Sequence, residues 1–207
     1  MKQFSPASVV FAGLLALALA GCSGTTPEPS ESPSPTSAAP TSSAPPTPKP
    51  ATSTSPAENL EPPQMPELAT EFSVAGFEAF VEYWFDAHNY ALATGDVELM
   101  MDVSDDRCVY CLNHELGIKE IYEADGWIDG GDVVPSSFFT NMAELEGGLY
   151  QGNFTLKQMK GTVYTAEGDV DESQVFDPDD YDYEMRAYHD GDGWVASKID
   201  LWEQPDD

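Results

Sequence analysis

The sequence predicts an α+β domain that follows an export signal and an extended linker. Apolar residues recur at helical spacing from residue 74 to 93 and alternate with polar residues from 181 to 187. The first 66 residues show neither pattern, because a short apolar run there gives way to Ser, Thr and Pro. Helices that precede a run of antiparallel strands are typical of α+β domains.

An apolar segment near the N-terminus predicts export. Lys2 precedes the run Val9–Ala20, which at about 12 residues is too short for a bilayer span of roughly 20 and fits a signal peptide. The residues that follow, Leu19-Ala20-Gly21-Cys22, resemble the lipobox of bacterial lipoproteins. We expect residues 1–21 to be removed and Cys22 to carry the lipid that holds the protein on the extracytoplasmic face of the cell membrane. The alternative is an ordinary signal peptide with a chance cysteine.

Residues 22–66 are expected to form the lipidated cysteine and a disordered tether. This stretch is mostly Ser, Thr, Pro and Ala, so it cannot bury enough apolar surface to offset the entropy of ordering. Proline at this density favours extended segments. The tether would hold the folded domain, expected over residues 67–207, away from the membrane.

The charge of the chain limits its partners. Its 37 acidic and 8 basic residues give a formal net charge of −29. Such a surface repels nucleic acid, and no basic cluster is present to bind phosphates. We expect no nucleic-acid partner. A solvated, repulsive surface is one explanation of the acidic excess, and a surface that binds cations or polyamines is another.

The first half of the domain is expected to be helical. Ser73 can cap a helix that ends near Gly95. One face of this helix is apolar and rich in aromatic residues, which requires a large opposing surface such as a curved sheet. Two further helices are expected over residues 97–103 and 109–124.

The second half has the pattern of strands. Residues 132–139 are expected to form an edge strand, since Pro135 interrupts them. Residues 149–165 are strand-like, with Gly152 and Gly161 as expected bulges. A half-buried strand follows at 181–187, then a hairpin turn at 190–193 and a last strand at 194–202. Gly130-Gly131 is expected to form a turn or bulge.

Several short motifs resemble an uncharacterised family of actinobacterial lipoproteins. They are Phe77–Trp84, Asn89–Ala91, Thr94–Asp96, the pair Cys108-x-x-Cys111, and Gly126–Gly131. The resemblance implies a cone similar to the nuclear transport factor 2 and polyketide-cyclase-like superfamily, in which a long first helix lies across a strongly curved antiparallel sheet. It implies no activity, because that superfamily contains isomerases, dehydratases and binding domains.

The cysteine spacing predicts one disulfide. If Cys22 carries lipid, Cys108 and Cys111 remain, and residues three apart in a helical turn lie within disulfide distance. A redox role is an alternative, since thiols at a helix start can have a lowered pKa. A zinc site is weaker, because His114 would complete only three of four ligands. We therefore expect no metal and no cofactor.

Catalytic motifs are missing from the sequence, and His88 is the one weak candidate for a base. It lies on the apolar face of the first helix and could face a cavity. The candidate pocket residues are Trp84, His88, Tyr122 and Trp127; the alternative for each is an ordinary place in the core. The acidic residues from 169 to 182 are expected to form a solvated loop rather than a calcium site.

These observations favour a non-catalytic domain at the cell envelope that binds a protein or a small ligand. One alternative is a lyase or isomerase of the cone type with His88 as its base, which requires an open pocket and a carboxylate beside that histidine. The other is a redox module that uses Cys108 and Cys111.

Overall fold

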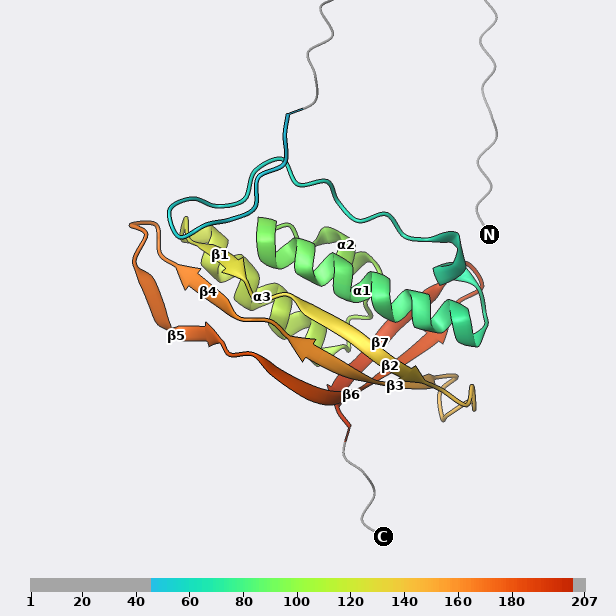
Figure 1. Ribbon diagram of the computed structural model, residues 1–207. Helices are drawn as coiled ribbons and strands as arrows, with labels where there is room; N and C mark the ends of the chain where they lie inside the picture. The colour runs from blue at the N-terminus through green and yellow to red at the C-terminus, as the bar shows by residue number, and fades with distance from the viewer. Residues whose placement is uncertain (1–45, 203–207) are drawn as a thin grey trace, which may run out of the picture. The chain divides into compact units, whose positions relative to one another are not determined.

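A long helix, α1 (Val74–Thr94), organises the domain in the computed structural model, which describes residues 46–202 (Figure 1). The Ser73 hydroxyl accepts a hydrogen bond of 2.9 Å from the Gly76 N–H and so caps the helix. Gly95 ends it in the left-handed conformation, with φ of 78°. The helix predicted from the apolar spacing is therefore confirmed. A short 3-10 helix, η1 (Glu67–Thr70), precedes it.

Two shorter helices follow α1, as the sequence predicted. They are α2 (Glu98–Asp102) and α3 (Val109–Glu123). The Trp84 indole N–H from α1 donates to the Ser104 hydroxyl at 2.9 Å, and that hydroxyl donates to the Met100 carbonyl at 2.7 Å. This chain of bonds joins α1 to the end of α2. Among residues 46–202, no helix combines the length and apolar character needed to cross a membrane.

Within the described part of the chain, seven strands form two antiparallel sheets. The larger has the order β2-β3-β6-β7 and the smaller the order β1-β4-β5. Their bounds are β1 (Trp127–Gly130), β2 (Val133–Phe139), β3 (Tyr150–Gln158), β4 (Gly161–Tyr164), β5 (Val170–Phe176), β6 (Asp179–His189) and β7 (Trp194–Leu201).

The two sheets adjoin where the β1–β2 and β3–β4 linkers meet, a place that we call the corner, and together they form one curved surface. The linkers between β1 and β2 and between β3 and β4 bond to each other: the Gly131 N–H donates to the Lys160 carbonyl at 3.0 Å and the Met159 N–H to the Asp132 carbonyl at 2.8 Å. Gly130 and Gly131 both have positive φ, which confirms the predicted turn. The segment 149–165, expected as one strand, is therefore two strands that lie on either side of this corner.

Neither glycine of that segment forms the expected bulge. Gly152 pairs regularly with Met185, and a Cβ there would lie 2.4 Å from the Phe138 ring. Gly161 pairs with Gly130 at the corner, where a Cβ would lie 2.6 Å from the Gly131 backbone. Close packing, and not a bulge, explains why both positions are glycine.

Helix α1 lies against the concave side of this surface (Figure 1). Its Phe77 ring stacks on Trp194 of β7 at 4.5 Å, and its Phe85 ring meets Phe154 of β3 at 5.5 Å. All four rings are buried. The structure thus has the α+β arrangement that the resemblance to the nuclear transport factor 2 superfamily implied.

Two strands were not expected from the sequence. β1 is only four residues long and ends in glycine. The acidic stretch 169–182, expected as a solvated loop, instead contains β5 and the start of β6. β5 is polar along most of its length and pairs only with β4, so it is an edge strand held by its backbone bonds and by Phe176, which packs against the core.

Residues 46–66, which we call the strap, belong to the domain and not to a free tether. Lys49 and Glu58 pair through their backbones and through a 2.6 Å ion pair. The Trp127 indole N–H donates to the Thr52 carbonyl at 2.8 Å. The boundary expected at residue 67 is thus about 20 residues too late, because specific docking orders a segment whose composition alone favours disorder. Residues 1–45, which include the predicted signal peptide and Cys22, lie outside the described residues.

Candidate binding cleft

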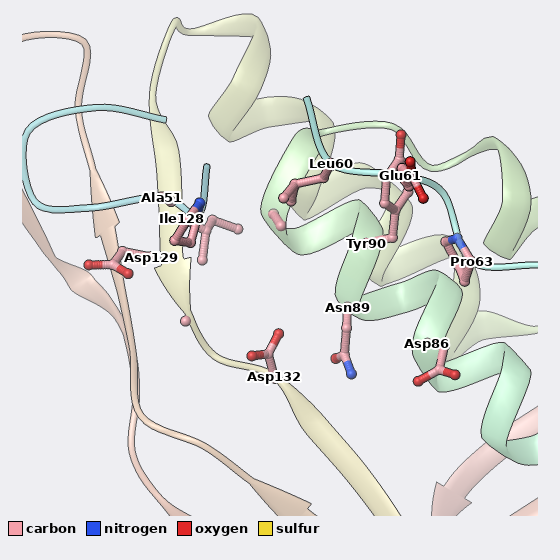
Figure 2. A pocket seen from close by; sticks show the side chains of 13 residues that line it. Ala51, Leu60, Glu61, Pro63, Asp86, Asn89, Tyr90, Ile128, Asp129 and Asp132 are labelled. Carbon is pink, nitrogen blue, oxygen red and sulfur yellow. The ribbon is translucent and has the colours of Figure 1, made fainter. Parts of the chain in front are cut away.

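A cleft of about 570 Å³ lies between the strap, α1 and the start of the curved sheet (Figure 2). We call it the strap cleft. The strap, α1 and the β1–β2 segment each supply one side of it. Its lining residues are Pro50, Ala51, Leu60, Glu61, Pro63, Asp86, Asn89, Tyr90, Ala93, Ile128, Asp129, Gly130 and Asp132.

Asn89 fixes the relative position of two of these walls. Its amide donates to the Val133 carbonyl at 2.8 Å and accepts from the Val133 N–H at 2.9 Å. This pair of bonds attaches α1 to the first residue of β2, next to Asp132. The Trp127 bond to Thr52 fixes the strap in the same way. The cleft is therefore built by specific contacts between segments far apart in the sequence.

All the charged residues that line the strap cleft are acidic. Glu61, Asp86, Asp129 and Asp132 line it, and none of its lining residues is Lys, Arg or His. Partial desolvation raises the pKa of Asp86 and of Asp132, although both side chains keep contact with solvent. The apolar part of the lining comes from Tyr90, Ala93, Ile128 and the strap. A cleft of this kind suits a ligand that carries positive charge and some apolar surface.

His88 does not line this cleft and lies in the core instead. Its side chain is 1% exposed, its ring stacks on Trp84 at 5.7 Å, and its Nε2 is 2.8 Å from Nδ1 of His114. Burial, and then repulsion from His114, lower the pKa of His88 to about 3. The isomerase hypothesis required an open pocket and a carboxylate beside His88, whereas the structure gives it a closed surrounding and a second histidine.

The other three candidate pocket residues pack against neighbouring parts of the domain. Trp84 is fully buried, Trp127 is 5% exposed and stacks on Tyr164, and the Tyr122 hydroxyl donates to the Leu92 carbonyl at 2.8 Å. None of the three lines the strap cleft. The surroundings of these side chains match the alternative of an ordinary place in the core.

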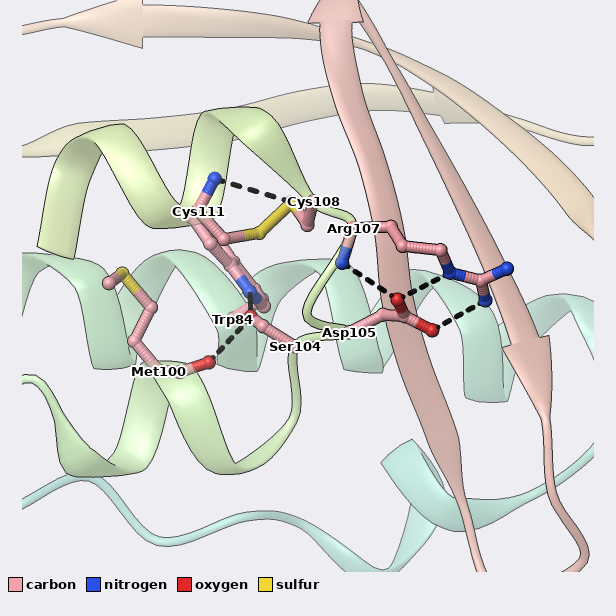
Figure 3. Close-up of a disulfide and its surroundings, with 7 residues drawn as sticks. All are labelled: Trp84, Met100, Ser104, Asp105, Arg107, Cys108 and Cys111. Atoms are coloured by element: carbon pink, nitrogen blue, oxygen red, sulfur yellow. Dashed lines mark hydrogen bonds and ion pairs between the residues drawn. A yellow bond between two sulfur atoms is a disulfide. The ribbon is translucent and has the colours of Figure 1, made fainter.

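Cys108 and Cys111 form the predicted disulfide (Figure 3). Their Cα atoms are 5.2 Å apart and both residues are fully buried beside α1. The bond lies at the start of α3, where the Cys108 sulfur also accepts from the Cys111 N–H. The disulfide leaves no free thiolate there for zinc, and His114 pairs with His88 instead. Burial of both sulfur atoms also removes the access that a redox module requires.

The cleft residues were not singled out from the sequence. Asp86 and Asn89 lie outside the apolar stripe of the first helix, and Asp129 and Asp132 flank the glycine pair. Two of the motifs that resemble the lipoprotein family, Asn89–Ala91 and Gly126–Gly131, both reach the cleft, and they are the indication that the sequence offers. The strap could not be found in this way, because its composition predicted a tether.

The acidic residues of the β5–β6 region do not gather into a metal site. Within residues 46–202, no group of three or more His, Cys, Asp or Glu side chains is arranged to hold a metal ion. Asp171 instead accepts bonds from the Ser173 N–H and hydroxyl, and its pKa is lowered by them.

Comparisons with known proteins place the chain in a family. Among solved structures, it is similar to the intermembrane space region of the chloroplast protein ARC6, with 12% identity, 65% of this chain and 99% of that chain covered, and a TM-score of 0.49. It is also similar to an Ntf2-like protein involved in plasmid conjugation, with 16% identity, 65% of this chain and 51% of that chain covered, and a TM-score of 0.34. No curated protein matches the chain significantly. A family model matches residues 46–200, strap included, and the chain therefore belongs to the family of unknown function DUF6318.

Proposed function

We propose that this protein is a lipid-anchored, extracytoplasmic binding protein whose domain holds a ligand in the strap cleft and catalyses no reaction on it. The observation that carries the proposal is the cleft itself: its three walls are joined by the specific bonds of Asn89 and Trp127. Its lining offers carboxylates and apolar surface but no nucleophile paired with a base. Such a lining supports binding better than catalysis.

The proposed ligand is an organic cation with apolar segments, such as a polyamine or an exposed lysine-rich chain. Four carboxylates would neutralise its charge. The Tyr90 ring can contribute a cation–π contact, and the apolar lining can cover the methylene groups between two charges. The net charge of −29 would attract such a ligand from a distance.

Spermidine is a direct probe of this proposal. We expect the full chain to bind it in calorimetric titration, and Asp86→Asn and Asp132→Asn each to weaken the affinity by about tenfold. Glu146→Gln is the matched control, since this exposed residue lies on another loop and loses the same charge. Equal affinities for the cleft variants and the control would mean that the acidic surface attracts spermidine without a site, and would refute the cleft proposal.

The proposed anchor has its own test. Cys22→Ala should abolish labelling by palmitate and release the protein from the membrane fraction. Cys108→Ala, which leaves the lipobox intact, should still be labelled. Incorporation of palmitate into the Cys22→Ala protein would refute the lipid anchor while leaving the binding proposal open to the spermidine titration.

A further inference from the structure

One edge of the larger sheet is only partly closed. β7 is an end strand of the order β2-β3-β6-β7. At its start, the Ala196 N–H donates to the Val103 carbonyl and its carbonyl accepts from the Asp105 N–H, at 2.9 and 2.8 Å. The chain between α2 and α3 thus pairs with β7 at this position, through the parallel bridge of Ser104 and Ala196. This pairing is an isolated bridge and does not extend to the later residues of β7.

The register shows which backbone groups remain at the open part of the edge. Trp202 donates to the Asp182 carbonyl, so residues 202, 200 and 198 turn their backbone groups toward β6. In an antiparallel ladder the intervening residues face the other way. Ile199 therefore presents its N–H and carbonyl groups to the open edge, and Leu201 its carbonyl, while the Leu201 N–H donates to the Asp200 carboxylate at 2.9 Å. A row of this kind is a template for another strand.

The surroundings of this edge are apolar and nearly neutral. A groove of about 600 Å³ runs beside it, and its lining includes Val109, Tyr110 and Ile199. Val109 is 67% and Leu201 52% exposed. Three of the eight basic residues of the chain, Arg107, Arg186 and Lys198, lie here, and each pairs with a carboxylate. In so acidic a protein, this is a region where two copies would repel each other little.

We propose that β7 pairs antiparallel with β7 of a second copy, around a two-fold axis at Ile199. The charges on the strand are self-complementary in this register, because Lys198 of each copy then lies opposite Asp200 of the other. Opposite charges at directly facing positions stabilise antiparallel pairs. A two-fold pairing also uses the same surface on both copies, so the β7 edge of each copy is closed in the dimer.

The dimer satisfies the open backbone groups and covers exposed side chains. Ile199 faces its counterpart and exchanges two backbone hydrogen bonds with it. In this register the half-exposed Leu201 lies opposite Ser197 of the second copy, a residue that lines the groove. Repulsion between the two acidic domains is reduced at physiological ionic strength, where the screening length is about 8 Å. The larger sheets of two copies then form one continuous sheet.

The mass of the full chain in detergent, measured by sedimentation equilibrium, tests the pairing. We expect a dimer in the wild type. Lys198→Asp and Asp200→Lys should each weaken it by about tenfold or more, because like charges then face each other. The double variant Lys198→Asp/Asp200→Lys should restore it. Lys157→Asp on β3 makes the same charge change away from this edge and should leave the dimer unchanged. Since Lys198 also contacts Glu184 and Asp200 within one copy, circular dichroism should verify that each variant is folded.

Crosslinking gives a second, independent readout. A carbodiimide joins an amine to a nearby carboxylate, and in a mixture of ¹⁴N- and ¹⁵N-labelled protein it should yield peptides that link Lys198 of one isotope to Asp200 of the other. A wild type that stays monomeric at about 100 µM refutes the proposal. A monomeric wild type would mean that Lys198 protects the edge strand from pairing, as lysines on edge strands do in other proteins. A dimer unaffected by the charge reversals would place the interface elsewhere and would equally overturn it.

Discussion

At the scale of single residues, the core contains one polar pair whose surroundings are aromatic. His88 lies between the Trp84 ring and His114, and His114 in turn stacks on Tyr110 at 4.1 Å. Nε2 of His88 has its partner in His114, whereas its Nδ1 is buried without a partner among the described residues. Burial lowers the pKa of both histidines, to about 3 for His88 and about 4 for His114. Both are neutral in the folded protein at pH 7.

This pair predicts a loss of stability in mild acid. Above the unfolded pKa of about 6.5 both imidazoles are neutral in both states, so their contribution is fully present. Below that pH the unfolded chain takes up protons that the folded chain excludes, and stability falls until the folded pKa values are reached. Between pH 7.5 and 5.5 we expect His88 alone to lower the free energy of unfolding by about 1 kcal/mol. His114 should lower it further.

Urea unfolding at a series of pH values measures this effect. The double variant His88→Leu/His114→Leu should have a flatter stability profile over the same interval, whatever its absolute stability. An unchanged slope in the double variant would show that other groups produce the acid sensitivity.

Two glycines of neighbouring strands should respond unequally to alanine. At Gly152 the added methyl group meets the Phe138 ring at 2.4 Å, and a side chain can shift. At Gly161 it meets backbone atoms of Gly131 at 2.6 Å, within the corner of the sheet. Overpacking typically costs about 1–3 kcal/mol. We expect Gly161→Ala to destabilise the domain more than Gly152→Ala in thermal unfolding, and the reverse order would contradict the role assigned to the corner.

At the scale of elements, the disulfide lies at the start of α3, where the Cys108 sulfur caps the helix. It closes a very short loop, so its contribution through the unfolded state should be below the roughly 3 kcal/mol expected for a 15-residue loop. Because Cys108 and Cys111 are both fully buried, reductant should reach the bond only when the domain opens. Thiol labelling after mild reduction should therefore be slow in buffer and fast in urea. Rapid labelling without denaturant would show that reductant reaches the disulfide in the folded domain, and would support the redox hypothesis.

The helices were predictable because the residues that start, end and orient each helix lie within one short stretch of sequence. Ser73, Gly95 and the aromatic stripe of α1 define its start, its end and its buried face within one stretch of sequence. Strands β1 and β5 lack such a pattern, since their positions depend on pairing with β4, which is distant from β1 in the sequence. The same reason hid the candidate site: Asp86, Asp129 and Glu61 come together only through the fold. The spacing of residues within one segment does not show which residues of other segments lie beside them in the fold.

At the scale of the whole domain, the strap connects the predicted tether to the candidate site. Ala51, Leu60 and Pro63 are half-buried against the cleft, and the strap leads directly into η1 and α1. The proposed lipid anchor would therefore join the domain at the cleft. Tension or steric crowding at the membrane would act first on the strap and on its bond to Trp127.

Two shortened chains can measure how much the strap contributes. A chain of residues 46–207 keeps all of its contacts, whereas a chain of residues 67–207 loses the Trp127–Thr52 bond and the burial of Ala51, Leu60 and Pro63. One buried hydrogen bond and three partly buried apolar side chains together amount to about 2–3 kcal/mol. We expect the shorter chain to unfold at a clearly lower temperature. Trp127→Phe in the longer chain keeps the ring stacked near Tyr164 but removes the N–H, and it should release the strap to proteases at a smaller cost in stability. Equal unfolding temperatures for the two chains would mean that residues 46–66 rest on the domain without stabilising it, and that the cleft lacks a fixed third wall.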